Sequence, residues 1–111
     1  MVLTSAPWWV RPGLETRDGR LTIAGEDAEE LARRHGTPLF VYDRARFAEN
    51  ARRLAAALDR AGVRHRLRFA LKAHPDPRVL EILHGLVGID ACSPGEVTRA
   101  LDCSWAPGDI S

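Results

Sequence analysis

The pattern of hydrophobic and polar positions divides the chain into a turn-rich beginning and a longer series of alternating strands and helices. In residues 1–25 turn signals flank short apolar pieces, and residues 21–23, which follow an Asp-Gly turn, predict a strand. A helix is predicted from Asp27, an N-cap with glutamate three residues later, to Gly36. A Thr-Pro pair then starts a strand predicted over residues 39–42.

The next helix is predicted over residues 44–61, with Asp43 as its cap and apolar positions at helical spacing. These positions are Phe47, Ala51, Leu54 and Leu58. A strand follows at residues 66–73, and a helix begins after the Pro-Asp-Pro of residues 75–77 and closes at Gly85. The side chains that this helix is expected to bury are Val79, Leu80 and Leu83.

A third βα unit and the start of a fourth complete the pattern. Residues 88–92 predict a strand, and Ser93 with Glu96 forms a capping box that opens a helix. The expected buried side of that helix is Val97, Ala100 and Leu101. Residues 109–111 look like the beginning of one more strand. Strand onsets about 22 residues apart indicate repeating βα units and a parallel sheet.

The fold class predicted from this order is α/β, as the N-terminal part of a (β/α)₈ TIM-type barrel. We expect a short β segment over residues 1–25 and an incomplete barrel domain over residues 26–111. A closed barrel of this kind needs about 250 residues, so the 111 residues are expected to be a fragment or a truncated reading frame.

Composition adds one feature to this picture. Of the 16 basic residues 15 are arginine, and the one lysine, Lys72, lies in an apolar run. An amine can lose its proton and condense with a carbonyl, whereas a guanidinium stays charged; an arginine-rich codon preference explains the same count. A net charge of +1 gives no support for nucleic acid or an anionic membrane as partner. Two cysteines and no apolar stretch of about 20 residues favour a cytoplasmic protein with reduced thiols.

Strand alternation places Lys72 on one face with Arg68, Ala70 and His74, leaving the apolar residues between them to pack under helices. Lys72 would then point into the barrel above a small alanine, near the carboxyl end of its strand, where barrel enzymes keep their chemistry. The alternative is a lysine that extends along the sheet to its solvated rim.

Asp90 is the second candidate, because a carboxylate in the middle of a strand needs a partner. Pairing of adjacent parallel strands would bring it beside Lys72; a structural carboxylate bound to loop amides is equally compatible. Glu96 is better explained by capping. His74 is a candidate contact for a ring or a substrate, although a loop histidine before proline is more frequent. The histidines have no metal-ligand spacing, so no metal site is expected.

Three segments together resemble a known family. They are G-T-P-L-F-V-Y-D (residues 36–43), F-A-L-K-A-H-P (residues 69–75) and G-I-D-A-C-S-P-G-E (residues 88–96). In this order and spacing the chain resembles the alanine-racemase-like (fold type III) pyridoxal-phosphate decarboxylases, and the first segment favours the diaminopimelate decarboxylase branch. The resemblance runs from about Leu21 to Ser111.

The resemblance implies that Lys72 is the lysine that holds pyridoxal 5′-phosphate covalently, and that Ala70 and Asp90 line the cofactor site. It implies an amino-acid decarboxylase, most simply one that converts meso-diaminopimelate to L-lysine and CO₂, with a small-molecule substrate and a homodimer as the complete form. Residues 1–25 would contribute to a β-domain. The isolated chain is expected to lack activity, because the family's remaining cofactor contacts lie beyond Ser111.

Three departures weaken the choice of substrate. The family more often has tyrosine at Phe69, asparagine at His74, and Ser-Gly-Gly-Glu at residues 93–96. The alternatives are a decarboxylase of ornithine, arginine or another basic amino acid, a racemase or aldolase on the same barrel, and a non-catalytic pyridoxal-phosphate-binding relative.

Overall fold

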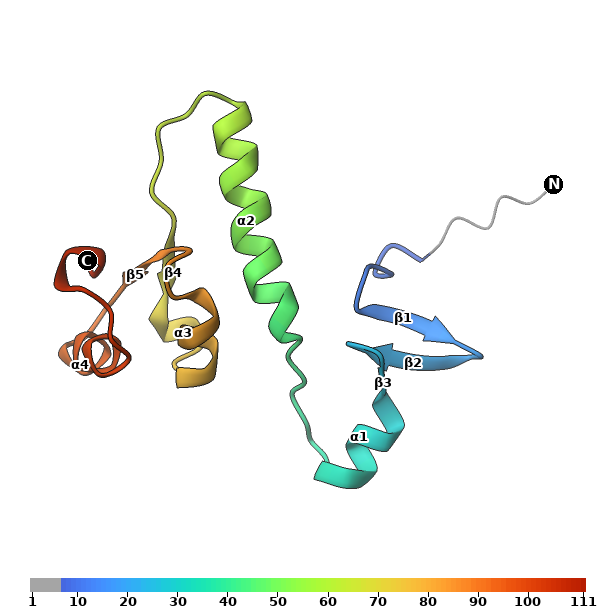
Figure 1. The fold of residues 1–111 in the computed structure, drawn as a ribbon. Coiled ribbons are helices and arrows are strands. Elements are labelled where there is room, and N and C mark those ends of the chain that lie inside the picture. Colours follow the sequence, from blue (N-terminus) through green and yellow to red (C-terminus); the bar gives the residue numbers. More distant parts are fainter. Residues whose placement is uncertain (1–6) are drawn as a thin grey trace. The chain divides into compact units, whose positions relative to one another are not determined.

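The computed structural model describes residues 7–111 and divides the chain into two compact units. The first unit extends to Asp43 and the second comprises Arg44–Ser111. Figure 1 shows the elements of each unit. The sequence-based boundary after residue 25 concerns the domains of a complete protein and stays a prediction.

The first unit is a three-stranded antiparallel sheet followed by a helix. Strands β1 (Leu14–Arg17), β2 (Arg20–Ile23) and β3 (Glu26–Asp27) pair in the order β1-β2-β3. The predicted Asp-Gly turn joins β1 to β2, and its aspartate and glycine have φ of 51° and 75°, as a two-residue hairpin turn requires. Helix α1 (Ala28–His35) begins where the sequence predicts, because the Asp27 side chain accepts the amide N–H of Glu30 at 3.0 Å.

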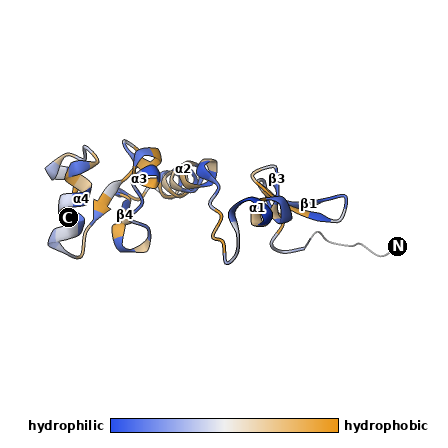
Figure 2. Ribbon diagram, turned by 90° about the horizontal axis from the view of Figure 1, so that it is seen from below, coloured by the Kyte–Doolittle hydropathy of each residue, from blue (hydrophilic) through white to orange (hydrophobic). Residues whose placement is uncertain are grey.

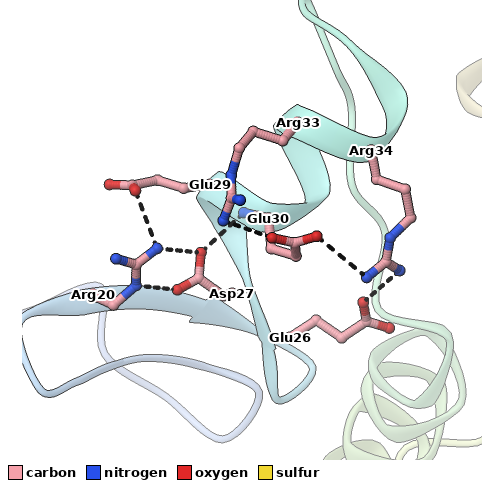
Figure 3. Close-up of polar contacts among 7 residues, drawn as sticks. All are labelled: Arg20, Glu26, Asp27, Glu29, Glu30, Arg33 and Arg34. Carbon is pink, nitrogen blue, oxygen red and sulfur yellow. Dashed lines mark hydrogen bonds and ion pairs between the residues drawn. The ribbon is translucent and has the colours of Figure 1, made fainter.

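Charged side chains connect the sheet of this unit to α1 (Figure 3). Arg20 on β2 donates to Asp27 and forms an ion pair with Glu29 at 3.1 Å. The hydrogen bond from Arg20 and the amide of Glu30 hold the pKa of Asp27 well below its usual range. The carboxylate that caps α1 is therefore ionised over the whole neutral range.

The strand predicted over residues 39–42 is wrong for this chain. These residues form neither a strand nor a helix, and Phe40 is 84% exposed. The segment is orange between α1 and α2 in Figure 2, as its hydropathy requires. A strand needs a hydrogen-bonded neighbour as well as an apolar pattern, and no neighbour pairs with this segment among the described residues.

The second unit alternates helices and strands as predicted. Helix α2 (Arg44–Arg60) precedes β4 (Arg68–Ala70), and a 3₁₀ helix, η1 (Leu71–Ala73), follows it. Helix α3 (Pro77–Leu83), β5 (Gly88–Asp90), α4 (Pro94–Asp102) and the 3₁₀ helix η2 (Pro107–Asp109) complete the unit. Strands β4 and β5 pair in parallel, which confirms the parallel sheet, and Ile110 adds one parallel bridge to Ile89.

A small hydrophobic core holds this unit together, with Leu71, Leu80 and Ile89 fully buried at its centre. The three side chains predicted for the buried face of α3 are all buried. Phe47 and Ala51 of α2 pack against this core. Leucine and isoleucine side chains buried in this way each contribute about 1.5–3 kcal/mol by removal from water.

Two predicted helix faces and two predicted strand lengths differ from the structure. Leu54 on α2 is 53% exposed and Leu101 on α4 is 45% exposed, so the buried face of α4 reduces to Ala100. Both predicted strands, residues 66–73 and 88–92, are three residues long. Helical spacing identifies the apolar face, but burial also needs an element to cover that face.

Candidate functional site

The carboxyl ends of β4 and β5 lie side by side and define the candidate site. The register pairs Phe69 with Ile89 and Ala70 with Asp90. Both strands end at the latter pair, where the chain turns away toward its next helix. Parallel strands bring the residues that follow them to the same edge of the sheet. Ala70 is the partner of Asp90, and Lys72 lies two residues after Ala70 in the sequence.

Lys72 lies on the 3₁₀ helix η1 rather than on the strand. The His74 amide donates to the Leu71 carbonyl at 3.2 Å, which closes the turn, and Leu71 is fully buried beneath it. The prediction that strand alternation continues through Lys72 and His74 is therefore wrong. The buried Leu71, which precedes Lys72, anchors the turn, while Lys72 is exposed at the strand end.

Asp90 is exposed at the end of β5, and Ala70 opposite it is half-buried. In the described part of the chain, residues 7–111, no ion pair joins Asp90 to Lys72. The structure thus brings the two strand ends together, and the predicted Lys72–Asp90 pair stays a prediction. Because alanine contributes only a methyl group, Ala70 itself adds little bulk to this edge of the sheet.

His74 follows η1 and contacts a ring from α2. The imidazole and the Phe47 ring meet edge to face, with centroids 6.1 Å apart and planes at 86°. Two residues on, Asp76 caps α3 by accepting the Arg78 amide at 2.8 Å. Hydrogen bonds from the Arg78 side chain hold the pKa of Asp76 well below its usual range. These contacts fix the segment that follows the turn carrying Lys72.

The turn after β5 is fixed by the predicted capping box. Ser93 accepts the Glu96 amide at 3.2 Å, and the Glu96 carboxylate accepts the Cys92 amide at 2.6 Å. Glu96 therefore stabilises the turn beside Asp90, as its capping interpretation predicts. No group of three His, Cys, Asp or Glu side chains within residues 7–111 is arranged to hold a metal ion.

Arg68 has a role that the sequence analysis does not identify. Its Nη1 donates to the carbonyls of Ile89 at 3.2 Å and Asp109 at 3.1 Å, so it joins three consecutive parallel segments. Gly88 makes room for this arrangement, because a Cβ there would lie 2.9 Å from the Asp109 carbonyl and 3.2 Å from Arg68 Nη1. Strand alternation places Arg68 on the face of Ala70, but an acceptor 41 residues away leaves no local signal.

Residues 44–111 match the family model described as pyridoxal-dependent decarboxylase, pyridoxal binding domain. The match covers the second unit, including both strand ends and Lys72. The chain therefore belongs to the pyridoxal-dependent decarboxylase family, and this part corresponds to its pyridoxal-binding domain.

Curated relatives and solved structures agree with this assignment. The chain is 44% identical over 101 residues to diaminopimelate decarboxylase of Methanothermobacter thermautotrophicus, covering 89% of this chain and 24% of the relative. The corresponding enzyme of Thermoplasma acidophilum is 36% identical over 90 residues, covering 80% of this chain and 22% of the relative.

A crystal structure of diaminopimelate decarboxylase from M. jannaschii is similar with a TM-score of 0.80 and 32% identity, covering 89% of this chain and 24% of that one. A structure of the M. jannaschii enzyme in complex with L-lysine is similar with a TM-score of 0.78 and 32% identity, over 87% of this chain and 24% of that one. The chain thus spans about a quarter of the length of these relatives. The shared fold is α/β and is consistent with the N-terminal part of a barrel.

Proposed function

We propose that the complete protein is a pyridoxal-phosphate-dependent diaminopimelate decarboxylase, which converts meso-diaminopimelate to L-lysine and CO₂. The observation that carries the proposal is the position of Lys72, the one lysine of the chain, directly after β4 in a pyridoxal-binding domain. Relatives named diaminopimelate decarboxylase support the substrate, and one of them was solved with L-lysine. The activity belongs to the complete protein, and we expect none from the 111 residues by themselves.

The residues at the two strand ends fit the cofactor chemically. A primary amine forms a covalent bond to the aldehyde of pyridoxal 5′-phosphate, and Lys72 is exposed at a strand end with no ion pair among the residues that the structure describes. Ala70 leaves space for a flat ring beside that amine. The exposed carboxylate of Asp90 offers a counter-charge at the same edge of the sheet.

The chain's own residues then have distinct tasks. Lys72 would hold the cofactor and exchange protons at Nζ when the substrate amine takes its place. Asp90 would orient the ammonium form of Lys72 by charge. His74 would contact the ring or the substrate, since its edge contact with Phe47 fixes it two residues beyond the lysine. Bound pyridoxal 5′-phosphate supplies the electron sink that loss of CO₂ requires.

The same proposal extends to the fold, the oligomeric state and the location of the complete protein. We infer a TIM-type barrel that continues the parallel sheet of β4 and β5, and a homodimer in the cytoplasm. Cys92 and Cys103 are both free thiols, as in a reducing compartment. No helix of the described residues is long and apolar enough to cross a membrane.

Borohydride reduction in the presence of pyridoxal 5′-phosphate, followed by intact mass and peptide mapping, tests the role of Lys72. Lys72 is the one side-chain amine of the 111 residues, so peptide mapping assigns a pyridoxyl group found in this part of the protein to Lys72. We expect labelling of Lys72 in the native protein and its loss in Lys72→Arg, which keeps the charge and removes the amine. Labelling confined to the N-terminal amine, or equal in the variant, would refute the assignment.

A further inference from the structure

Arg68 lies on the face of the parallel sheet that also carries Ala70 and Asp90. Paired positions of parallel strands share a face, and the register pairs Arg68 with Gly88. Because Gly88 has no side chain, the Arg68 side chain passes over it: a Cβ at Gly88 would lie 3.4 Å from Cγ and 3.2 Å from Nη1 of Arg68. The glycine therefore opens the path by which the arginine crosses β5 to the next segment.

The Arg68 guanidinium binds the backbone that leads directly into Asp90. Its Nη1 donates to the Ile89 carbonyl at 3.2 Å, and this carbonyl belongs to the peptide group that contains the Asp90 nitrogen. The Ser111 amide donates to the same carbonyl at 3.0 Å, so two donors fix the plane of this peptide. Nη1 also donates to the Asp109 carbonyl at 3.1 Å, on the segment that lies beyond β5. The orientation of Asp90 therefore depends on Arg68.

Asp90 is the carboxylate at this edge that is available to Lys72. The next carboxylates along the chain after the two strands have other tasks, since Asp76 caps α3 and Glu96 completes the capping box of α4. Within residues 7–111 the Asp90 side chain forms no ion pair. What directs this carboxylate is therefore the backbone that carries it.

We propose that Arg68 is a positioning residue, which holds the peptide before Asp90 so that the Asp90 carboxylate is directed at the amine of Lys72. The role rests on the proposed function, in which that amine holds the cofactor and the carboxylate orients it. Arg68 contacts neither the cofactor nor the substrate, and its effect passes through Asp90. An arginine suits the task because its N–H groups are fixed in one plane and its charge is not lost by deprotonation.

The test is the reactivity of Lys72 in the complete protein after hydroxylamine has removed any bound cofactor. The rate of Lys72 acetylation by acetic anhydride is measured against a free lysine derivative at one mildly alkaline pH, and peptide mapping identifies the site. A nearby carboxylate favours the ammonium form, which does not react, so acetylation should be about two- to fivefold faster in Arg68→Met. Loss of the arginine charge alone acts in the opposite direction, because a nearby cation favours the neutral, reactive amine.

Two comparisons separate positioning from a general loosening of the sheet. Asp90→Asn should raise the acetylation rate at least as much as Arg68→Met does, and the double variant should be no faster than Asp90→Asn, because both changes remove the same interaction. Arg66→Met is the matched control. Arg66 donates to the Gly108 carbonyl at 3.4 Å and not to the peptide before Asp90, so the rate should stay close to that of the parent.

An unchanged or slower rate in Arg68→Met would overturn the proposal, and so would a double variant faster than Asp90→Asn. Arg68→Gln, which is too short to reach both carbonyls, should give the same rise and replaces Arg68→Met if that variant does not fold. These rates do not depend on the cofactor. If borohydride reduction with pyridoxal 5′-phosphate leaves Lys72 unlabelled while the rates change as expected, the proposed function is wrong and the positioning of Asp90 stands. If Lys72 is labelled but the Arg68 variants change nothing, the positioning alone is wrong.

Discussion

Replacing Gly88 by alanine should destabilise the second unit, although the backbone at Gly88 does not need glycine for a positive φ. On backbone grounds alone this substitution would stabilise by about 0.4–1 kcal/mol, because alanine has fewer unfolded conformations. The new methyl group, however, would lie 2.9 Å from the Asp109 carbonyl and 3.2 Å from Arg68 Nη1. The carbonyl belongs to the backbone, so the segment that carries it must shift.

The expected net loss is about 1–3 kcal/mol in the free energy of unfolding, the usual cost of inserting a methylene where no space exists. Urea unfolding measures it, with Trp105 fluorescence as the signal in a background that lacks Trp8 and Trp9. Amide exchange gives a local readout, since the Ser111 amide donates to Ile89 at 3.0 Å and should exchange faster in the variant.

Gly108→Ala is the matched control for Gly88→Ala. A Cβ at Gly108 meets nothing within 4 Å, and this glycine also has no positive φ. It should therefore be neutral or slightly stabilising. If Gly88→Ala proves as stable as Gly108→Ala, and the Ser111 amide exchanges at an unchanged rate, these results would contradict the close packing of the three parallel segments.

Three further outcomes follow from the described contacts. Leu80→Ala should cost about 2–5 kcal/mol in urea unfolding because this side chain is fully buried, whereas Leu54→Ala, at a half-exposed position, should stay within about 0.5 kcal/mol; similar losses would contradict the assigned core. Ser93→Ala should lower the unfolding free energy by about 1 kcal/mol through loss of the α4 cap, and Ser93→Thr should retain most of it. The free energy of unfolding should be constant around neutral pH and fall below about pH 4, the ordinary carboxyl range. The reason is that the folded chain holds the pKa of Asp76 lower than the unfolded chain does. If Asp76→Asn showed the same dependence of the unfolding free energy on acid pH, this reasoning would be contradicted.

The parts of the fold that sequence predicts well are those set by neighbouring residues. Asp27 and Ser93 cap helices that begin where the pattern places them, since a cap acts within three residues of itself. The parallel pairing of β4 and β5 also follows from the spacing of the βα units. The predictions that fail concern features that depend on another element of the fold. Residues 39–42 have a strand pattern and no neighbour, and Leu101 has a helical position and no cover.

In the candidate site, too, the features set by neighbouring residues are predictable and the contacts between distant residues are not. The position of Lys72 at a strand end is visible in the sequence, because an apolar run and the following proline mark where the strand must stop. The 3₁₀ turn that carries it is not visible, since it depends on the burial of Leu71 against side chains distant in sequence. The contacts of Arg68 and the ring contact between His84 and Trp105 join residues about 20 to 40 positions apart, which no single-sequence pattern reports.

The register of β4 with β5 also determines which length changes the chain can accept during evolution. Every paired position is twenty residues from its partner, as with Arg68 and Gly88 or Ala70 and Asp90. An inserted residue inside either strand would slip this pairing and turn every later side chain of that strand to the opposite face. Insertions in the loops before and after α3 (Pro77–Leu83) leave both strands and the buried face of this helix intact. Homologues should therefore vary in length in these loops, while the two strands stay free of gaps.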